Sequence, residues 1–295
     1  MRRLALALLG LFVSLSATAM AQETASDPVA SAADSLVAVS LKDGTRLQGR
    51  IVGSDERSIT IMTIGGIEVK APRSSVASIE PLRGRMVRGQ FRRQDPNYTR
   101  LLFTPTGRPL RRGEGYFSDV WVLFPNVAYG ITGNLTVLVG SSMIPGVGIG
   151  DQLKYVAPRF GVSLGRDVAV AVGTLYGNAH SQGGGVAYAT GTVGPPDRSV
   201  TAAFGVPYVG TSDFKGVAII VLGGNVRMTN SLALVTENWL FFGTGSEKGS
   251  SQAYSLALRF FGDRLSGDFG ALFNKDVLEA GFPVPWLSLT YHFGK

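Results

Sequence analysis

The chain of 295 residues contains no cysteine and only two histidines, His180 and His292. The absence of thiols excludes disulfides and thiolate metal sites. Two imidazoles leave a transition-metal site short of nitrogen ligands, and the sequence has no G-x-S-x-G, H-E-x-x-H or P-loop motif. We therefore expect no metal and no cofactor, and stability must come from burial and backbone hydrogen bonding.

Long apolar runs are also missing. After residue 21 there is no uninterrupted apolar stretch of about 18 residues, the length that a membrane-spanning helix needs. A chain that crosses a bilayer without such a helix must do so as a closed β-barrel, because every backbone polar group needs a partner in lipid. Any integral membrane form of this chain is therefore expected to be all-β.

The first 21 residues have the pattern of a secretory signal. Arg2 and Arg3 give a positive start, an apolar core follows from Leu4 to Leu15, and Ala19-Met20-Ala21 forms an A-x-A cleavage site. We interpret residues 1–21 as a signal peptide and residues 22–35, which are small and polar without period, as a flexible spacer. The sequence thus predicts an exported protein.

Short polar turn signals recur through the second half of the chain. Their centres, at residues 132, 166, 197, 229 and 263, are 34, 31, 32 and 34 residues apart, and a longer Gly/Ser-rich stretch lies between each pair. Tight turns that alternate with longer loops predict a series of β-hairpins. In an exported protein this asymmetry is typical of an outer-membrane barrel, with its short turns in the periplasm and its long loops outside.

This alternation predicts an antiparallel transmembrane barrel of about twelve strands over residues 99–295. Both chain ends must lie on the periplasmic side, so a strand has to ascend before the one at 117–131, and TRLLFTPTG at 99–107 is the available segment. The expected strands are 99–107, 117–131, 134–144, 153–165, 168–180, 184–194, 199–210, 216–228, 231–243, 251–262, 265–274 and 285–294.

The last expected strand carries two further signals. Leu287, Leu289 and Tyr291 alternate with Ser288 and Thr290, which predicts one face toward lipid and one toward the lumen. Its sequence PWLSLTYHF, at 285–293, resembles the C-terminal signal by which barrel assembly machinery recognises its clients. The resemblance implies that machinery and outer-membrane lipid as partners.

Residues 36–82 form a separate region with five short expected strands. The stretch LKDGTRLQGRIVGSDERSITIM and the closing SSVASIE resemble Sm-like or SH3-like small barrels. The resemblance implies a small periplasmic β-domain, and because the domain is exported we do not expect nucleic acid as its ligand. Residues 97–132 resemble a group of uncharacterised exported proteins of Gram-negative bacteria, which implies no activity.

The net charge of +7 comes from one segment, because residues 83–112 hold nine arginines against one acid, Asp95. One interpretation is a binding surface for an anionic envelope component. The other, which we favour, is a solvated Arg-rich linker over 83–98. The anion-binding candidates are Arg83, Arg85, Arg88, Arg92 and Arg93.

Two sets of residues could carry chemistry or contact a solute. His180 and Ser181 are adjacent in an expected external loop and are the candidates for an acyl hydrolase, a role we do not favour. Charges are expensive on the lipid face of a barrel, so ionisable residues within strands should face the lumen. These lumen-facing candidates are Arg159, Glu237, Arg259, Asp268 and His292.

The sequence therefore predicts an integral outer-membrane β-barrel with a periplasmic N-terminal domain. We expect it to act as a narrow channel or as a structural and interaction protein. The sequence does not identify a solute. The alternatives are an outer-membrane enzyme that hydrolyses lipid acyl groups and a soluble periplasmic β-protein.

Overall fold

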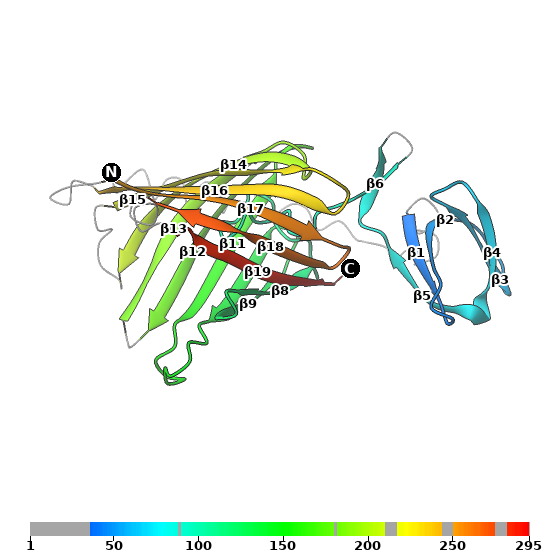
Figure 1. The fold of residues 1–295 in the computed structure, drawn as a ribbon, viewed down its shortest axis with the longest axis horizontal. Helices are drawn as coiled ribbons and strands as arrows, with labels where there is room; N and C mark the ends of the chain where they lie inside the picture. Colours follow the sequence, from blue (N-terminus) through cyan, green and yellow to red (C-terminus); the bar gives the residue numbers. More distant parts are fainter. Residues whose placement is uncertain are drawn as a thin grey trace, which may run out of the picture. The chain divides into compact units, whose positions relative to one another are not determined.

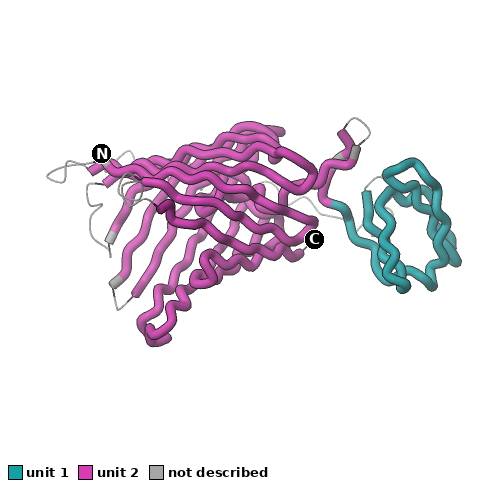
Figure 2. The backbone as a smooth tube through the Cα atoms, in the orientation of Figure 1, with its two compact units in different colours: residues 1–82 teal, residues 83–295 magenta. Residues whose placement is uncertain are grey.

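The computed structural model describes residues 36–87, 90–179, 182–209, 217–243, 250–274 and 282–294. The expected signal peptide and spacer, at 1–21 and 22–35, lie outside these residues. The described chain is all-β and divides into two compact units, one ending at Leu82 and one starting at Arg83 (Figure 2). No helix among the described residues is long and apolar enough to span a bilayer.

The first unit is a five-stranded antiparallel sheet in the order β4-β3-β2-β1-β5. Alternate apolar side chains from three of its strands, including Val37, Val39, Ile59 and Ile61, form its buried core. The sheet is not closed, because β4 and β5 are its two edges, so the five strands agree with the sequence but the expected small closed barrel does not. The elements are β1 (Leu36–Leu41), β2 (Arg46–Ser54), β3 (Ser58–Thr63), β4 (Glu68–Pro72), the 3₁₀ helix η1 (Arg73–Ser75) and β5 (Val76–Pro81).

The second unit contains a closed barrel of twelve antiparallel strands (Figure 1), which confirms the predicted fold class. Each strand pairs with its neighbours in sequence, and β19 pairs with β8 to close the ring. The barrel strands are β8 (Gly115–Val120), β9 (Phe124–Gly130), β10 (Leu135–Ser141), β11 (Lys154–Ser163), β12 (Val168–Ala179), β13 (Gln182–Val193), β14 (Arg198–Val209), β15 (Val217–Arg227), β16 (Leu232–Gly243), β17 (Ser250–Phe261), β18 (Leu265–Phe273) and β19 (Val284–Phe293).

All five short turns lie where the sequence predicts them, at one end of the barrel. Their chemistry explains their tightness: Thr132 Oγ1 accepts hydrogen bonds from the backbone N–H of Asn134 and Leu135 (3.2 and 2.9 Å). Gly165 and Gly194 take positive φ angles of 137° and 105°, which glycine adopts without strain. The β8 start and the β19 end lie at this same end of the barrel.

The walls alternate as the sequence predicts. In β19, Leu287 and Leu289 are 49% and 58% exposed on the outside, whereas Ser288 and Thr290 are 2% and 0% exposed on the inside. The same pattern places apolar side chains outside and small or polar ones inside in β18 and in β17 as far as Phe260, whereas Phe261 is buried. The exterior of the barrel is therefore an apolar surface.

Two strand predictions were wrong. One expected strand is two strands and another is not in the barrel, so the total of twelve is still correct. The expected strand at 117–131 is two strands, β8 and β9, joined at Trp121 and Val122, whose φ angles are 56° and 62°. The turn was missed because it contains no glycine, asparagine or proline. The expected strand at 99–107 is not part of the barrel wall.

Residues 83–98, expected as a linker, belong to the second unit. They form the hairpin of β6 (Gly84–Val87) and β7 (Gln90–Arg93) and the start of a buried segment. We call residues 94–114 the inner segment. It connects β7 to β8 through the interior of the barrel.

Candidate functional site

The inner segment begins and ends at the short-turn end of the barrel. The backbone N–H of Arg93, just before it, donates to Asn230 Oδ1 in the β15–β16 turn (2.8 Å). Near its other end the N–H of Gly113 donates to the carbonyl of Gly130, the last residue of β9 (2.9 Å). The segment thus enters the lumen and returns to the same end.

Within the lumen the inner segment folds into a narrow hairpin. The N–H of Thr106 donates to the carbonyl of Thr99 (2.9 Å), and the N–H of Leu101 donates to the carbonyl of Thr104 (2.8 Å). We call Leu101–Thr104 the tip. Thr99 is 1% exposed, and Leu101 and Leu102 are also buried, whereas Phe103 is half-exposed inside the barrel.

Glu237 of β16 holds the tip from the wall. Its Oε2 accepts three backbone hydrogen bonds, from Leu102, Phe103 and Thr104 (2.9, 3.0 and 3.0 Å). Its Oε1 accepts from the Thr104 hydroxyl (3.0 Å) and from Trp239 Nε1 (2.8 Å). Five donors therefore compensate the desolvation of this buried carboxylate and fix the turn.

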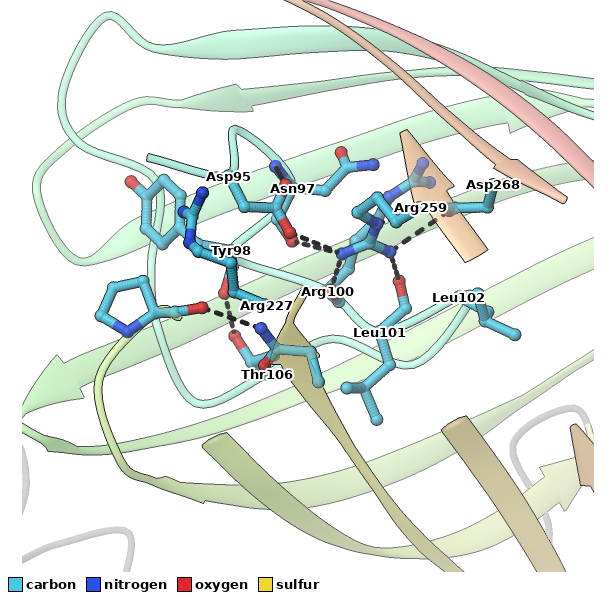
Figure 3. Close-up of polar contacts among 12 residues, drawn as sticks. Asp95, Asn97, Tyr98, Arg100, Leu101, Leu102, Thr106, Arg227, Arg259 and Asp268 are labelled. Atoms are coloured by element: carbon cyan, nitrogen blue, oxygen red, sulfur yellow. Dashed lines mark hydrogen bonds and ion pairs between the residues drawn. The ribbon is translucent and has the colours of Figure 1, made fainter. Parts of the chain in front are cut away.

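Arg259 of β17 holds the base of the hairpin (Figure 3). Its guanidinium pairs with Asp268 of β18 (2.6 Å) and with Asp95 of the inner segment (3.2 Å). It also donates to backbone carbonyls of the inner segment, among them that of Leu101 (2.5 Å). Asp268 lies opposite Arg259 in the strand register and accepts from Ser288 Oγ (3.0 Å). This network joins the wall to the inner segment.

Two other predicted lumen-facing residues contact the same hairpin. Arg159 of β11 donates from Nη1 to the carbonyls of Thr99 and Thr106 (3.1 Å each). His292 of β19 forms a hydrogen bond from Nε2 to Asn97 Oδ1 (2.8 Å). All five lumen-facing candidates are therefore buried inside the barrel, and Asp268 joins the hairpin through Arg259.

Glu114 fastens the end of the inner segment. Its Oε2 accepts from the Tyr98 hydroxyl (3.0 Å) and from the N–H of Arg111 (3.2 Å), and Arg83 lies 3.6 Å from its Oε1. Burial raises the pKa of the Tyr98 phenol above its ordinary value, so Tyr98 stays a donor to this carboxylate.

Two of the anion-binding candidates pair with acidic side chains. Arg83 pairs with Glu114, and Arg93 pairs with Asp263 (2.7 Å). Arg92 is exposed. The Arg85 side chain and Arg88 lie outside the described residues, as do His180 and Ser181.

A cavity of about 290 Å³ lies beside the tip inside the barrel. The inner segment forms part of its lining, and the rest comes from the strands, with Leu175 of β12 and Ile219 of β15 in the halves that lead away from the short turns and Tyr116 of β8 and Thr136 of β10 near the short-turn end. Its lining residues are Arg100, Phe103, Thr104, Pro105, Tyr116, Val120, Asn126, Thr136, Leu138, Tyr155, Ala157, Arg159, Leu175, Val186, Tyr188, Ala203, Gly205, Ile219, Val221 and Trp239.

The sequence reasoning missed the inner segment and, with it, the roles of Asp95 and Arg100. A signal was present, because Pro105 is a poor residue for a strand that must pair on both sides. The structure also explains Gly107, where a Cβ atom would come within 2.1 Å of the Ala169 carbonyl oxygen. Only glycine allows this backbone to lie so close to the wall.

No protein-family model matches this sequence, and neither does any curated protein. Among solved structures, the chain is similar to a KdgM porin in complex with disordered oligogalacturonate, with 8% identity, a TM-score of 0.46, and coverage of 61% of this chain and 98% of the porin. It is similar to the outer-membrane protein OmpT of Vibrio cholerae, with 10% identity, a TM-score of 0.33, and coverage of 88% and 95%. For OccK10 of Pseudomonas aeruginosa the identity is 11%, the TM-score 0.33, and the coverage 88% and 98%. Since all three TM-scores lie below 0.5, these likenesses carry no argument about what the barrel binds or transports.

Proposed function

We propose that this protein is an integral outer-membrane β-barrel that acts as a narrow channel, closed from within by its inner segment. The membrane placement rests on the apolar exterior of the barrel, which includes Phe204, Leu256, Phe269 and Leu289. So much exposed apolar surface around a complete ring is unfavourable in water and suits a lipid environment. We place the short turns and the N-terminal unit on the periplasmic side.

The observation that carries the channel proposal is the buried hairpin in the lumen, with a cavity beside its tip. A barrel of eight strands is filled by side chains, and one of sixteen leaves a water channel. A barrel of twelve strands has a lumen of intermediate width, which can hold a chain segment, a solute or both. Here the inner segment fills one end and the cavity occupies the next part of the lumen. A small molecule can pass only if the tip moves away from Glu237.

The two alternatives have less support. The acyl hydrolase rests on His180 and Ser181, which lie outside the described residues, and no contact among the described residues favours it. A soluble periplasmic protein would have to keep the apolar ring around the barrel in water. The electrical recordings described below distinguish a channel from a structural role.

The membrane placement is tested by fractionation. We expect the protein in the outer-membrane fraction after carbonate washing and a shift in its gel migration on heating, because closed barrels resist unfolding by cold detergent. Release by carbonate or by salt would contradict the placement.

The closed channel is tested by electrical recording in planar bilayers. Because Thr99 and Thr106 hydrogen-bond to each other, replacing residues 100–105 by Gly-Gly removes the tip while a two-residue turn can still close the hairpin. We expect the unaltered protein to show no steady conductance and the shortened variant to conduct steadily.

A matched control replaces the six exposed or half-buried residues at 145–150, in the β10–β11 connection, by the same Gly-Gly pair. We expect this variant to stay closed. If the protein without its tip also failed to conduct while remaining heat-modifiable, the channel would be rejected and the structural role would stand.

A further inference from the structure

Two arginines in the cavity lining lack an acidic partner. Arg100 and Arg159 are each 6% exposed, and within the described residues neither has a carboxylate oxygen within 4.0 Å, in contrast to Arg259, which has two such partners. No aspartate or glutamate is among the described residues that line the cavity. A buried positive charge without a counter-ion is unfavourable, so this part of the lumen is suited to an anion.

Arg100 has unused hydrogen-bonding capacity. Its guanidinium donates from Nη2 to Thr290 Oγ1 (2.5 Å) and lies over the Tyr116 ring, 5.2 Å from the centroid. Its Nε–H is buried and has no partner among the described residues. Guanidinium groups bind carboxylates through pairs of parallel hydrogen bonds, and Arg100 retains donors for such a contact.

The remainder of the cavity is largely apolar. The tip contributes Phe103, and the walls contribute Leu138, Val186, Val221 and Trp239. The volume of about 290 Å³ is near the lower end of the range for small-molecule sites. The cavity thus combines a positively charged region with an apolar region in a space for one small molecule.

We propose that this cavity binds a small amphipathic carboxylate, with its head group against Arg100 and Arg159 and its apolar tail among the wall residues. The proposal rests on the proposed function, because the molecule would reach the cavity through the barrel. The head group would sit against the inner hairpin: Arg100 belongs to it, and Arg159 holds its Thr99 and Thr106 carbonyls. Ligand binding and the position of the tip are therefore linked.

The test measures binding of decanoate to the full-length protein in lipid nanodiscs by calorimetry, with the heat from empty nanodiscs subtracted. Decanol has the same tail without the charge, and acetate has the charge without the tail. We expect decanoate to bind more tightly than either. Equal affinity for decanol and decanoate would overturn the role of the arginines, and failure of decanoate to bind would overturn the proposal.

Two variants locate the site. Arg100→Gln should weaken decanoate binding at least about tenfold, as expected for loss of a charged hydrogen-bonding partner, and leave decanol binding unchanged. Ala203→Phe, which places a ring in the cavity from β14, should weaken both ligands. The matched control Arg92→Gln removes the same charge from an exposed position and should change neither.

The variants also keep the two proposals distinguishable. Unchanged decanol binding by Arg100→Gln shows that this variant retains the folded barrel, and heat-modified migration shows it for Ala203→Phe. Decanoate affinity that is unaffected by both substitutions would overturn the site. Such a result would not affect the proposed function, which is tested separately by fractionation and by the conductance of the variant without its tip.

Discussion

At the scale of single residues, the interior of this barrel is governed by a few buried charges. Arg259 is 1% exposed, and Asp95 and Asp268, which are also buried, compensate its charge. Removing one partner from such a group leaves the others charged and buried without compensation. Substitutions here should therefore affect stability far more than substitutions at exposed arginines.

We expect Arg259→Met to lower the free energy of unfolding by about 3 to 5 kcal/mol, because it leaves two carboxylates unpaired in the lumen. Urea unfolding followed by tryptophan fluorescence in lipid vesicles measures the change. Adding Asp268→Asn to this variant should restore part of the loss, and Arg92→Met serves as the exposed control. A loss below about 1 kcal/mol would show that the network contributes little.

Glu237 controls the tip through its charge as well as its shape. In Glu237→Gln the new amide NH₂ group would face groups that now donate hydrogen bonds to the carboxylate. Hydrogen bonds to a charged group contribute about 1.5 to 3 kcal/mol, and the substitution removes the charge. We expect faster amide hydrogen exchange at Leu102, Phe103 and Thr104, measured by mass spectrometry on the intact barrel. Glu68→Gln, at an exposed position in β4, is the control. Unchanged protection of the tip would contradict the assigned role.

The inward direction of these buried charges could be predicted from the sequence. Ionisable residues in barrel strands should face the lumen because lipid excludes them, and Arg159, Glu237 and Arg259 do lie inside. Their partners could not be predicted, since they depend on backbone carbonyls and N–H groups of a segment that was expected in the wall. Strand alternation determines whether a side chain faces the lumen or the lipid, but it does not determine which groups that side chain contacts.

At the scale of elements, the β8–β9 turn holds the two non-glycine residues with positive φ angles in the described part of the chain. Trp121 and Val122 both adopt left-handed backbone angles, which are unfavourable for residues with a β-carbon and more so for a β-branched one. Trp121 is compensated, because its Nε1 donates to the Pro285 carbonyl (2.7 Å) and its ring packs against Trp286 at 5.2 Å. Val122 is exposed and has no such compensation.

We expect Val122→Asn to raise the free energy of unfolding by about 1 kcal/mol, because asparagine tolerates the left-handed region better than valine. The urea midpoint of the variant measures this. Val147→Asn in the β10–β11 connection, where φ is not positive, should bring no gain. A lower free energy of unfolding for Val122→Asn would contradict the presence of backbone strain at this position.

The turn that follows β2 in the first unit depends on Asp55. Its oxygens accept from the Ser58 hydroxyl (2.8 Å) and from the N–H groups of Arg57 and Ser58 (2.8 and 2.6 Å). These bonds, led by that of the Ser58 hydroxyl, lower the pKa of Asp55 to about 2. The folded pKa lies below the unfolded value of about 3.9, so this contribution to stability is complete above pH ~4 and is lost as the pH falls through about 2.

We expect the carboxyl carbon resonance of Asp55 in the full-length protein to titrate with a midpoint near 2. Ser58→Ala removes the largest cause and should move the midpoint toward the ordinary value. A midpoint near that ordinary value in the unaltered protein would show that the turn does not depend on these hydrogen bonds.

Elements differed in how well the sequence predicted them. The five short turns carry glycine, asparagine, aspartate or threonine in positions that these residues favour, so they were found. The Trp121–Val122 turn contains none of them, and only the tertiary contacts of Trp121 reveal why it forms. The count of strands predicts a strand at 99–107, within the inner segment, although Pro105 opposes that assignment.

At the scale of the whole molecule, the closed barrel and the inner segment depend on each other. The ring of twelve strands provides a lumen wide enough for a chain segment, and the segment satisfies charges from several strands that would otherwise be buried alone. The proposed closed channel requires that the inner segment occupies the lumen of the protein in its membrane.

Thiol accessibility tests that requirement most directly, because a chain without cysteine gives no background. Thr99 is 1% exposed and its hydroxyl has no partner, so Thr99→Cys should fold normally, while Ile149→Cys places a thiol at an 88% exposed position. In intact outer membranes we expect a hydrophilic maleimide to label the Ile149→Cys variant rapidly and the Thr99→Cys variant only after heat unfolding. Equal labelling rates at both positions in the folded protein would contradict the account.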